Sequence, residues 1–145
     1  MEVGLTYEQM KGMNNMWKQY IKILLDQSIE WAKKDLTVPV LEKVREGVCQ
    51  HLVKADLNGA LIEVVNANNK QLIGIKGIVA KETKRAFVII SEDEKQRTIL
   101  KEKTVFKVPL PYDNFCVNLW GDMLLHKGYE RTKAGFKERG SLSLY

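Results

Sequence analysis

The chain is poor in cysteine and has no long apolar run. Its 145 residues include 2 cysteines, Cys49 and Cys116, which stand far apart and outside any C-x-x-C pair. This spacing argues against a disulfide framework and a zinc site, and it favours a reducing compartment, cytosol or nucleus. No stretch approaches about 18 consecutive apolar residues, so no membrane-spanning helix is predicted. The N-terminus shows no charged segment followed by an apolar run, so no secretion signal is predicted.

Residue patterns typical of a catalytic site are also scarce. His51 lies two residues from Cys49, but two ligands do not make a zinc site, and His126 stands alone. The carboxylates at 92–94 are consecutive, so they point in different directions and favour a solvated acidic turn over a magnesium site. No phosphate-binding loop of the G-x-x-x-x-G-K-[ST] kind occurs. We therefore expect the protein to have no catalytic residues, metal or cofactor of its own.

Length and charge narrow the class of protein. The length fits one domain, and the hydrophobic share of 45% is enough for a modest core. The net charge of +5 and the pI of about 9.1 favour a polyanionic partner, with a merely solvated basic surface as the alternative.

Periodicity divides the chain into three zones. In residues 1–53 apolar side chains recur at three- and four-residue steps, which predicts two helices. Thr6 and Gln9 have the spacing of a capping box, and Pro39 fits the first turn of the second helix. Residues 54–125 carry short β-rich runs between polar turns. Residues 126–145 are polar and basic, which predicts a C-terminal tail or a short helix.

The middle zone predicts an antiparallel meander. Such a short meander removes its exposed edges by curling into a small twisted barrel, and Gly74 and Gly77 fit sharp bending of its longest strand. The fold class is therefore mainly β, with helical extensions. The predicted strands span 60–65, 72–80, 86–90, 98–100, 104–108 and 115–120.

One face of the first helix is apolar. A methionine and aromatic stripe is most often core, but a small barrel has little surface with which to cover two helices. A protein partner could share this burial, and self-packing is the equal alternative. The residues that we assign to this candidate partner face are Met10, Met13, Trp17, Tyr20, Ile21 and Leu24.

Basic residues are frequent in the middle zone. Between positions 70 and 107 there are ten, against five acidic residues. Strand alternation places several of them on the outer face, where lysine and arginine pair with phosphates without reading sequence. A salt-bridged solvent face is the alternative. The ten residues are Lys70, Lys76, Lys81, Lys84, Arg85, Lys95, Arg97, Lys101, Lys103 and Lys107.

Four segments together resemble one family. They are residues 17–21 (Trp-Lys-Gln-Tyr-Ile), 52–60, the glycine-rich strand 74–84 that ends in Glu-Thr-Lys, and the basic segment 131–140. The chain resembles the Sm-like protein subunit shared by archaeal and eukaryotic ribonuclease P and by eukaryotic ribonuclease MRP.

The resemblance implies a twisted Sm-like barrel, pairing with a zinc-ribbon protein subunit, and joint contact with the catalytic RNA among the other subunits. In this family the RNA removes the 5′ leader of precursor tRNA with Mg²⁺, and the protein stabilises the RNA fold. It also implies location in the nucleus and nucleolus, or in the cytoplasm of an archaeon.

The resulting hypothesis is a non-catalytic RNA-binding subunit of a ribonucleoprotein. The alternatives are a small-barrel protein–protein adaptor and a ribosome-associated RNA-binding protein. The residues expected to contact RNA are Lys54, Lys76, Lys81, Lys84, Arg85, Arg131, Lys133, Lys137 and Arg139.

Overall fold

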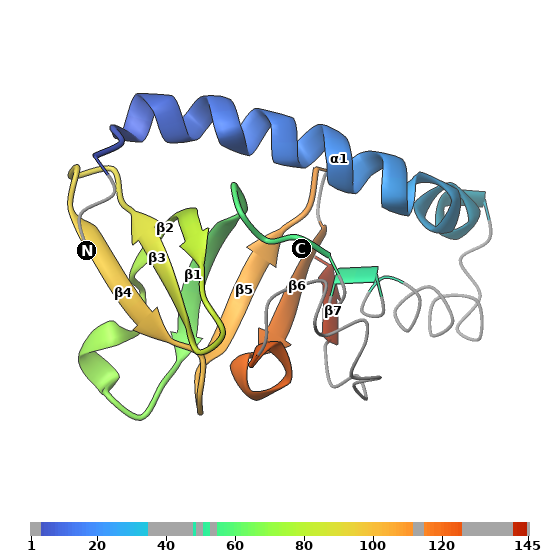
Figure 1. The fold of residues 1–145 in the computed structure, drawn as a ribbon. Helices are drawn as coiled ribbons and strands as arrows, with labels where there is room; N and C mark the ends of the chain where they lie inside the picture. The colour runs from blue at the N-terminus through green and yellow to red at the C-terminus, as the bar shows by residue number, and fades with distance from the viewer. Residues whose placement is uncertain are drawn as a thin grey trace.

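The computed structural model describes residues 4–34, 48, 51–52, 55–111, 115–125 and 141–144. The fold is mainly β, with a long N-terminal helix, α1 (Tyr7–Lys34), lying across the sheet (Figure 1). This confirms the predicted class. The strands are β1 (Leu61–Asn66), β2 (Lys76–Glu82), β3 (Ala86–Ile90), β4 (Gln96–Leu100), β5 (Val105–Pro109), β6 (Phe115–Trp120) and β7 (Ser141–Leu144). Two short 3-10 helices, η1 (Lys70–Leu72) and η2 (Gly121–Leu124), complete the described elements.

The strands form one antiparallel sheet in the order β4-β3-β2-β1-β5-β6-β7. β1 is central because it pairs with both β2 and β5, and the chain then adds β6 and β7 on the β5 side. The edge strands β4 and β7 do not pair with each other in the part of the chain that the structure describes. The described strands therefore form an open sheet and not the predicted closed barrel. They also depart from a simple meander, because β5 pairs with β1 and not with β4.

The open sheet is nevertheless strongly curled. Phe87 on β3 meets Phe106 on β5 edge to face, with ring centroids 5.2 Å apart, although β2 and β1 separate these strands in the sheet. Bulges interrupt the pairing near Val79 in β2 and near Val64 in β1, and bulges increase local bending. The concave face thereby encloses the core.

Gly77 permits the close approach of β2 and β3. A Cβ at this position would lie 2.7 Å from the Ile90 carbonyl oxygen, so a side chain does not fit. Gly74 lies before the strand with a φ of +92°, a conformation that glycine adopts at little cost. β2 therefore begins at Lys76, four residues later than predicted, because η1 and the Gly74 turn occupy the intervening segment.

The predicted capping box begins α1. The Gln9 backbone N–H donates to Thr6 Oγ1 (3.2 Å), and Gln9 Oε1 accepts from the Thr6 N–H (2.9 Å). The helix then buries one stripe of residues at three- and four-residue spacing against the sheet and the loop before β1. The fully buried apolar members of this stripe are Met10, Ile21 and Leu25.

Two hydrogen bonds fix α1 to the loop that precedes β1. The Trp17 indole N–H donates to the Asp56 carbonyl oxygen (2.8 Å), and Asn14 Nδ2 donates to that of Gly59 (2.9 Å). Gly59 has a φ of +91°, and a Cβ there would lie 3.0 Å from the Met13 carbonyl oxygen. The helix therefore packs directly on glycine backbone.

The other predicted extensions are only partly described. Of the second predicted helix, Val48, His51 and Leu52 lie in the described residues and are helical, and the rest lies outside them. The prediction of a tail or short helix is wrong at its end, because Ser141–Leu144 forms β7 against β6. Its Ser-Leu-Ser-Leu sequence has the two-residue period of a strand. Residues 126–140 lie outside the described residues.

Gly59→Ala should lower the free energy of unfolding by about 1–3 kcal/mol, because it adds both a positive-φ penalty and a clash with α1. Gly12→Ala is the matched control. A Cβ at this exposed helical position meets nothing within 4 Å, so it should raise stability by about 0.5–1 kcal/mol. Urea unfolding of both variants measures the difference, and equal stabilities would contradict the proposed close packing.

Candidate functional site

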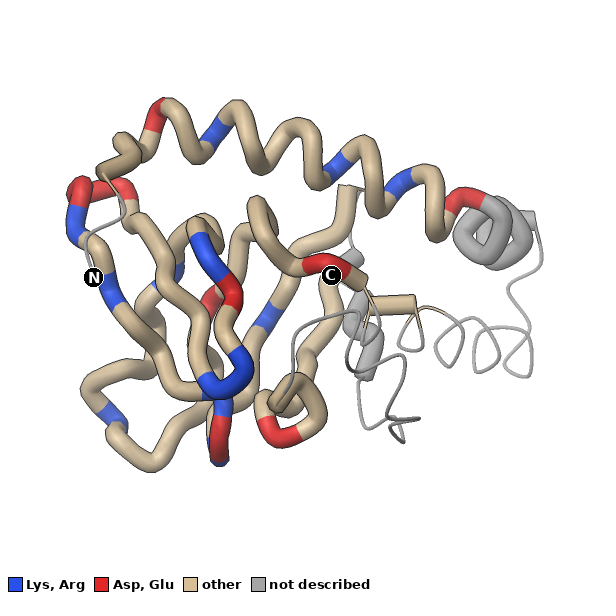
Figure 2. Tube along the Cα trace, viewed as in Figure 1, with Lys and Arg blue, Asp and Glu red and all other residues tan. Residues whose placement is uncertain are grey.

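Two turns that lie apart in the sequence meet at one end of the sheet. One joins β2 to β3 at residues 83–85, and the other joins β4 to β5 at residues 101–104. The Lys101 backbone N–H donates to the Arg85 carbonyl oxygen (2.8 Å), which holds the turns together. Basic residues mark both turns in Figure 2. We call the exposed cations of the two turns, Lys84, Arg85 and Lys103, the basic rim.

A buried ion pair lies beneath the basic rim. The Lys101 side chain is 0% exposed, and its ammonium lies 2.8 Å from Glu82 Oε2, whose side chain is 2% exposed. The same ammonium donates to the Thr83 carbonyl oxygen (2.8 Å) and lies 4.8 Å from the centre of the Phe87 ring. Lys101 therefore neutralises Glu82 and ties the β2–β3 turn from below, since a desolvated charge requires such partners.

The β2–β3 turn closes on its own side chains. The Thr83 N–H donates to the Ala86 carbonyl oxygen (2.9 Å), and Thr83 Oγ1 accepts from the Ala86 N–H (3.1 Å). A further contact of 3.4 Å joins the Lys101 ammonium to the Lys84 carbonyl oxygen. The turn backbone is thus held inside, while Lys84 and Arg85 are exposed at its tip.

The β4–β5 turn is held by the start of η2. The Gly121 N–H donates to the Thr104 carbonyl oxygen (2.7 Å), and Asp122 Oδ1 accepts from the Lys103 N–H (2.9 Å). Lys103 has a φ of +56°, which costs free energy outside glycine, so this turn is held in place by its neighbours. A Cβ on Gly121 would overlap the Lys101 carbonyl oxygen.

The structure separates the residues that the sequence predicted to contact RNA. Lys84 and Arg85 lie together in the basic rim, and Lys81 is half-buried on β2. Lys76 is exposed but begins β2, at the far end of that strand. Lys54, Arg131, Lys133, Lys137 and Arg139 lie outside the described residues.

Lys101 and Lys103 are among the ten basic residues of the middle zone, but the sequence did not assign either to RNA contact. Lys101 acts through an ion pair with a residue 19 positions away, which no local pattern reveals. One sequence feature could have pointed to Lys103 as a site residue, namely its place in a polar turn between two short β-rich runs. The hydrogen bonds of Lys101 to the β2–β3 turn show that the β4–β5 turn adjoins Lys84.

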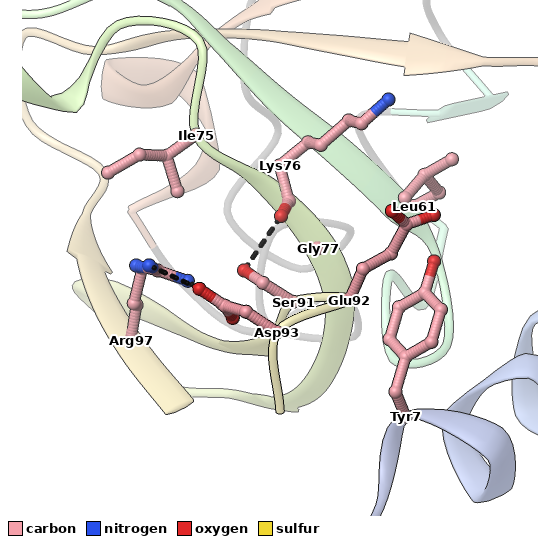
Figure 3. Close-up of a pocket in the computed structure, with 9 residues that line it drawn as sticks. All are labelled: Tyr7, Leu61, Ile75, Lys76, Gly77, Ser91, Glu92, Asp93 and Arg97. Atoms are coloured by element: carbon pink, nitrogen blue, oxygen red, sulfur yellow. Dashed lines mark hydrogen bonds and ion pairs between the residues drawn. The ribbon is translucent and has the colours of Figure 1, made fainter. Parts of the chain in front are cut away.

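A pocket of about 270 Å³ lies at the far end of the sheet, near the start of α1 (Figure 3). Asp93 and Arg97 form an ion pair there (3.0 Å), and Ser91 Oγ donates to the Lys76 carbonyl oxygen (2.8 Å). The Arg97 hydrogen bond, helped by the Lys95 N–H, lowers the pKa of Asp93. These interactions tie the β3–β4 turn, so we assign the pocket a structural role.

The candidate partner face divides into two parts. Met10, Trp17 and Ile21 are at most 4% exposed and pack within the chain, so the structure corrects their assignment to a partner surface. Met13 is half-buried against the same sheet. Tyr20 and Leu24 remain 39% and 36% exposed. Two residues that the sequence analysis did not assign extend this exposed stripe, Met16 (71%) and Ile23 (80%).

Metal-binding clusters and membrane-spanning helices are absent from the described ranges. No group of three or more His, Cys, Asp or Glu side chains is placed there to hold a metal ion. No described helix is long and apolar enough to cross a membrane. Cys116 is a buried free thiol on β6, and His51 is exposed.

Lys101→Met should lower the free energy of unfolding by about 3–5 kcal/mol, because Glu82 would be left buried without its partner. The double variant Lys101→Met with Glu82→Leu removes both charges and should recover most of this stability. Lys95→Met, at an exposed lysine, should change stability by less than about 0.5 kcal/mol. A Lys101→Met variant as stable as Lys95→Met in urea unfolding would contradict the ion pair's role.

Comparison with known proteins identifies relatives of the chain. A family model described as ribonuclease P/MRP, subunit p29, matches residues 50–134, which include the basic rim. Ribonuclease P protein subunit p29 of Homo sapiens is 31% identical over 138 residues, covering 95% of this chain and 57% of that protein. Ribonuclease P protein component 1 of Methanocaldococcus jannaschii is 36% identical over 87 residues, covering 60% of this chain and 90% of that protein.

The chain also spans 44% of the RNases MRP/P 32.9 kDa subunit of Saccharomyces cerevisiae, with 28% identity over 132 residues and 86% of this chain covered. It thus covers little more than half the length of its mammalian relatives and most of the archaeal one. The family model covers more than half of the 145 residues. The chain therefore belongs to the ribonuclease P/MRP subunit p29 family.

Proposed function

We propose that the protein is a non-catalytic RNA-binding subunit of ribonuclease P, and of ribonuclease MRP where that enzyme is present. The observation that carries this proposal is the basic rim, in which Lys84, Arg85 and Lys103 are exposed above turns tied to a buried ion pair. Because the family relatives are named as protein subunits of these enzymes, a polyanionic RNA is the partner that best fits the rim.

The rim acts by charge neutralisation. Cations that bind phosphates release condensed counterions, so binding is favourable at low salt and weakens as salt rises. Because the turn backbones are already held, binding orders only the side-chain torsions and costs little backbone conformational entropy. Two RNA segments that both carry phosphates can approach each other when lysine and arginine lie between them. In this way the protein stabilises the folded RNA.

The chemistry of the complex belongs to the RNA. The RNA cleaves the phosphodiester bond that joins the 5′ leader to precursor tRNA and uses Mg²⁺ for this step, and the protein binds no cofactor of its own. Precursor tRNA then meets this subunit indirectly, through the RNA that it stabilises. The nucleus and nucleolus are the expected location in a eukaryote, and the cytoplasm in an archaeon.

The exposed stripe of α1 is the contact surface for a zinc-ribbon protein subunit. Met16, Tyr20, Ile23 and Leu24 follow helical three- and four-residue spacing and are exposed by 36–80%, so they offer continuous apolar area. Methionine and aromatic residues are frequent in the centres of such interfaces.

Lys84→Ala combined with Arg85→Ala should weaken binding to the ribonuclease P RNA. The negative slope of log K against log salt should become shallower by about two, one unit for each phosphate that the variant no longer neutralises. Lys18→Ala combined with Lys22→Ala removes the same charge from α1 and serves as the control. Filter binding at several salt concentrations measures both slopes. Equal slopes in the two double variants would refute the rim as the RNA-binding surface, and salt-independent retention of protein partners alone would favour an adaptor.

Ile23→Glu should weaken association with the zinc-ribbon subunit at least about tenfold, because a carboxylate would be buried in an apolar interface. Asn15→Glu adds the same charge at an exposed polar position of α1 and should have little effect. Calorimetric titration of the two subunits, with circular dichroism to verify folding, separates the variants. Unchanged affinity in Ile23→Glu would place the interface elsewhere.

A further inference from the structure

Trp120 is a large aromatic residue that the core does not cover. It ends β6 and is 49% exposed. Its neighbour Leu119 is 1% exposed and lies opposite Phe106, which is equally buried, so these two face the core. Because successive side chains of a strand point to opposite faces, Trp120 lies on the outer face of the sheet, opposite Val105 on β5.

Trp120 adjoins the basic rim through the backbone. The next residue, Gly121, donates its N–H to the Thr104 carbonyl oxygen (2.7 Å), and Asp122 Oδ1 accepts from the Lys103 N–H (2.9 Å). Gly121 also packs on the backbone of Lys101, which binds the Arg85 carbonyl oxygen. Trp120 is thus attached to both turns of the rim by a short, hydrogen-bonded path.

Further positive charge lies on the same outer face. Lys107 pairs across β5 and β6 with Asn118, two residues before Trp120. Lys107 and Trp120 are therefore diagonal neighbours on one face, a separation of about 7–8 Å between backbone positions. On this face Lys107 also lies opposite Glu63 on β1, so the positive charge nearest the Trp120 ring comes chiefly from the basic rim, which the Gly121–Thr104 hydrogen bond adjoins.

We propose that Trp120 stacks on an unpaired base of the RNA whose phosphates bind the basic rim. The proposal rests on the proposed function and deepens it, since it assigns a single-stranded or bulged nucleotide to this face of the sheet. An unpaired base exposes its ring faces, and aromatic side chains bind these faces without regard to sequence. The basic rim holds the adjoining phosphates, so stacking and charge act on the same segment of RNA.

An exposed tryptophan can also mark a protein interface. At Trp120 the charged residues nearby favour RNA as the partner. The neighbouring exposed residues include Glu102 and Lys103, and Lys84 and Arg85 lie on the adjoining turn. Leu100 (63% exposed) precedes the β4–β5 turn, whereas the large exposed apolar residues of α1 lie on the helix. Charged residues are depleted from the centres of protein interfaces, whereas cations beside an aromatic ring are typical of single-stranded nucleic-acid sites.

The test uses two probes with the same number of phosphates. One is a ten-nucleotide adenylate, and the other is a ten-unit strand in which abasic spacers replace every base. The complete chain should bind the adenylate about five- to 150-fold more tightly than the abasic strand, the range expected for one stacked base. Trp120→Leu should bind both probes with the same affinity, and Trp120→Phe should recover part of the preference. Ile73→Ala changes an exposed apolar residue in the loop before β2 and should keep the preference.

The outcomes distinguish the stacking site at Trp120 from the RNA-binding function of the basic rim. Lys84→Ala combined with Arg85→Ala should weaken both probes equally and leave the preference for bases intact. If wild type binds both probes equally, or if Trp120→Leu keeps the preference, the stacking site is refuted while the rim stands. If wild type binds neither probe at low salt, the proposed function itself is refuted. Thermal unfolding of Trp120→Leu verifies that the variant is folded.

Discussion

The buried ion pair between Lys101 and Glu82 is the interaction on which the rest of the site depends. A lysine with 0% exposure is stable only where its charge is met, and here a carboxylate and turn carbonyl groups surround it. The pair joins β2 to the segment after β4. Since Glu82 also donates its backbone N–H to Asn58 Oδ1 (2.8 Å), the same residue reaches the loop on which α1 packs. One buried residue, Glu82, thereby connects the loop beneath α1, the sheet and the basic rim.

The close packing of α1 and the curl of the sheet both help to enclose the core. Gly59 lets the helix approach backbone directly, and Gly77 lets β2 and β3 approach each other. The bulges near these strands bend the sheet until Phe87 and Phe106 meet across its concave face. The turns at the end of the sheet are held by the Lys101–Glu82 ion pair and by hydrogen bonds, so their tips need no apolar residues. They are therefore available to carry charge.

Local patterns predicted some elements well and long-range pairings poorly. The Thr6–Gln9 capping box and the strands at 86–90 and 115–120 depend on neighbouring residues, so the sequence was sufficient to find them. Periodicity located the apolar face of α1, but it does not say what covers that face, and Trp17 was assigned to a partner although the sheet and loop bury it. The strand order likewise depends on β1 pairing with both β2 and β5, and no local sequence pattern predicts these partners.

At the candidate site, too, local patterns were informative and long-range contacts were not predicted. The sequence assigned Lys84 and Arg85 to RNA contact together with Lys76 and Lys81, which the structure places elsewhere, on β2. The role of Lys101 and the place of Trp120 required the folded chain. The most direct test of the account is ultraviolet crosslinking of the intact ribonucleoprotein, with mass spectrometry of the nucleotide-bearing peptides. The account predicts adducts on peptides that contain Lys84 and Arg85, Lys103 or Trp120. Adducts confined to α1, with none between residues 81 and 120, would contradict it.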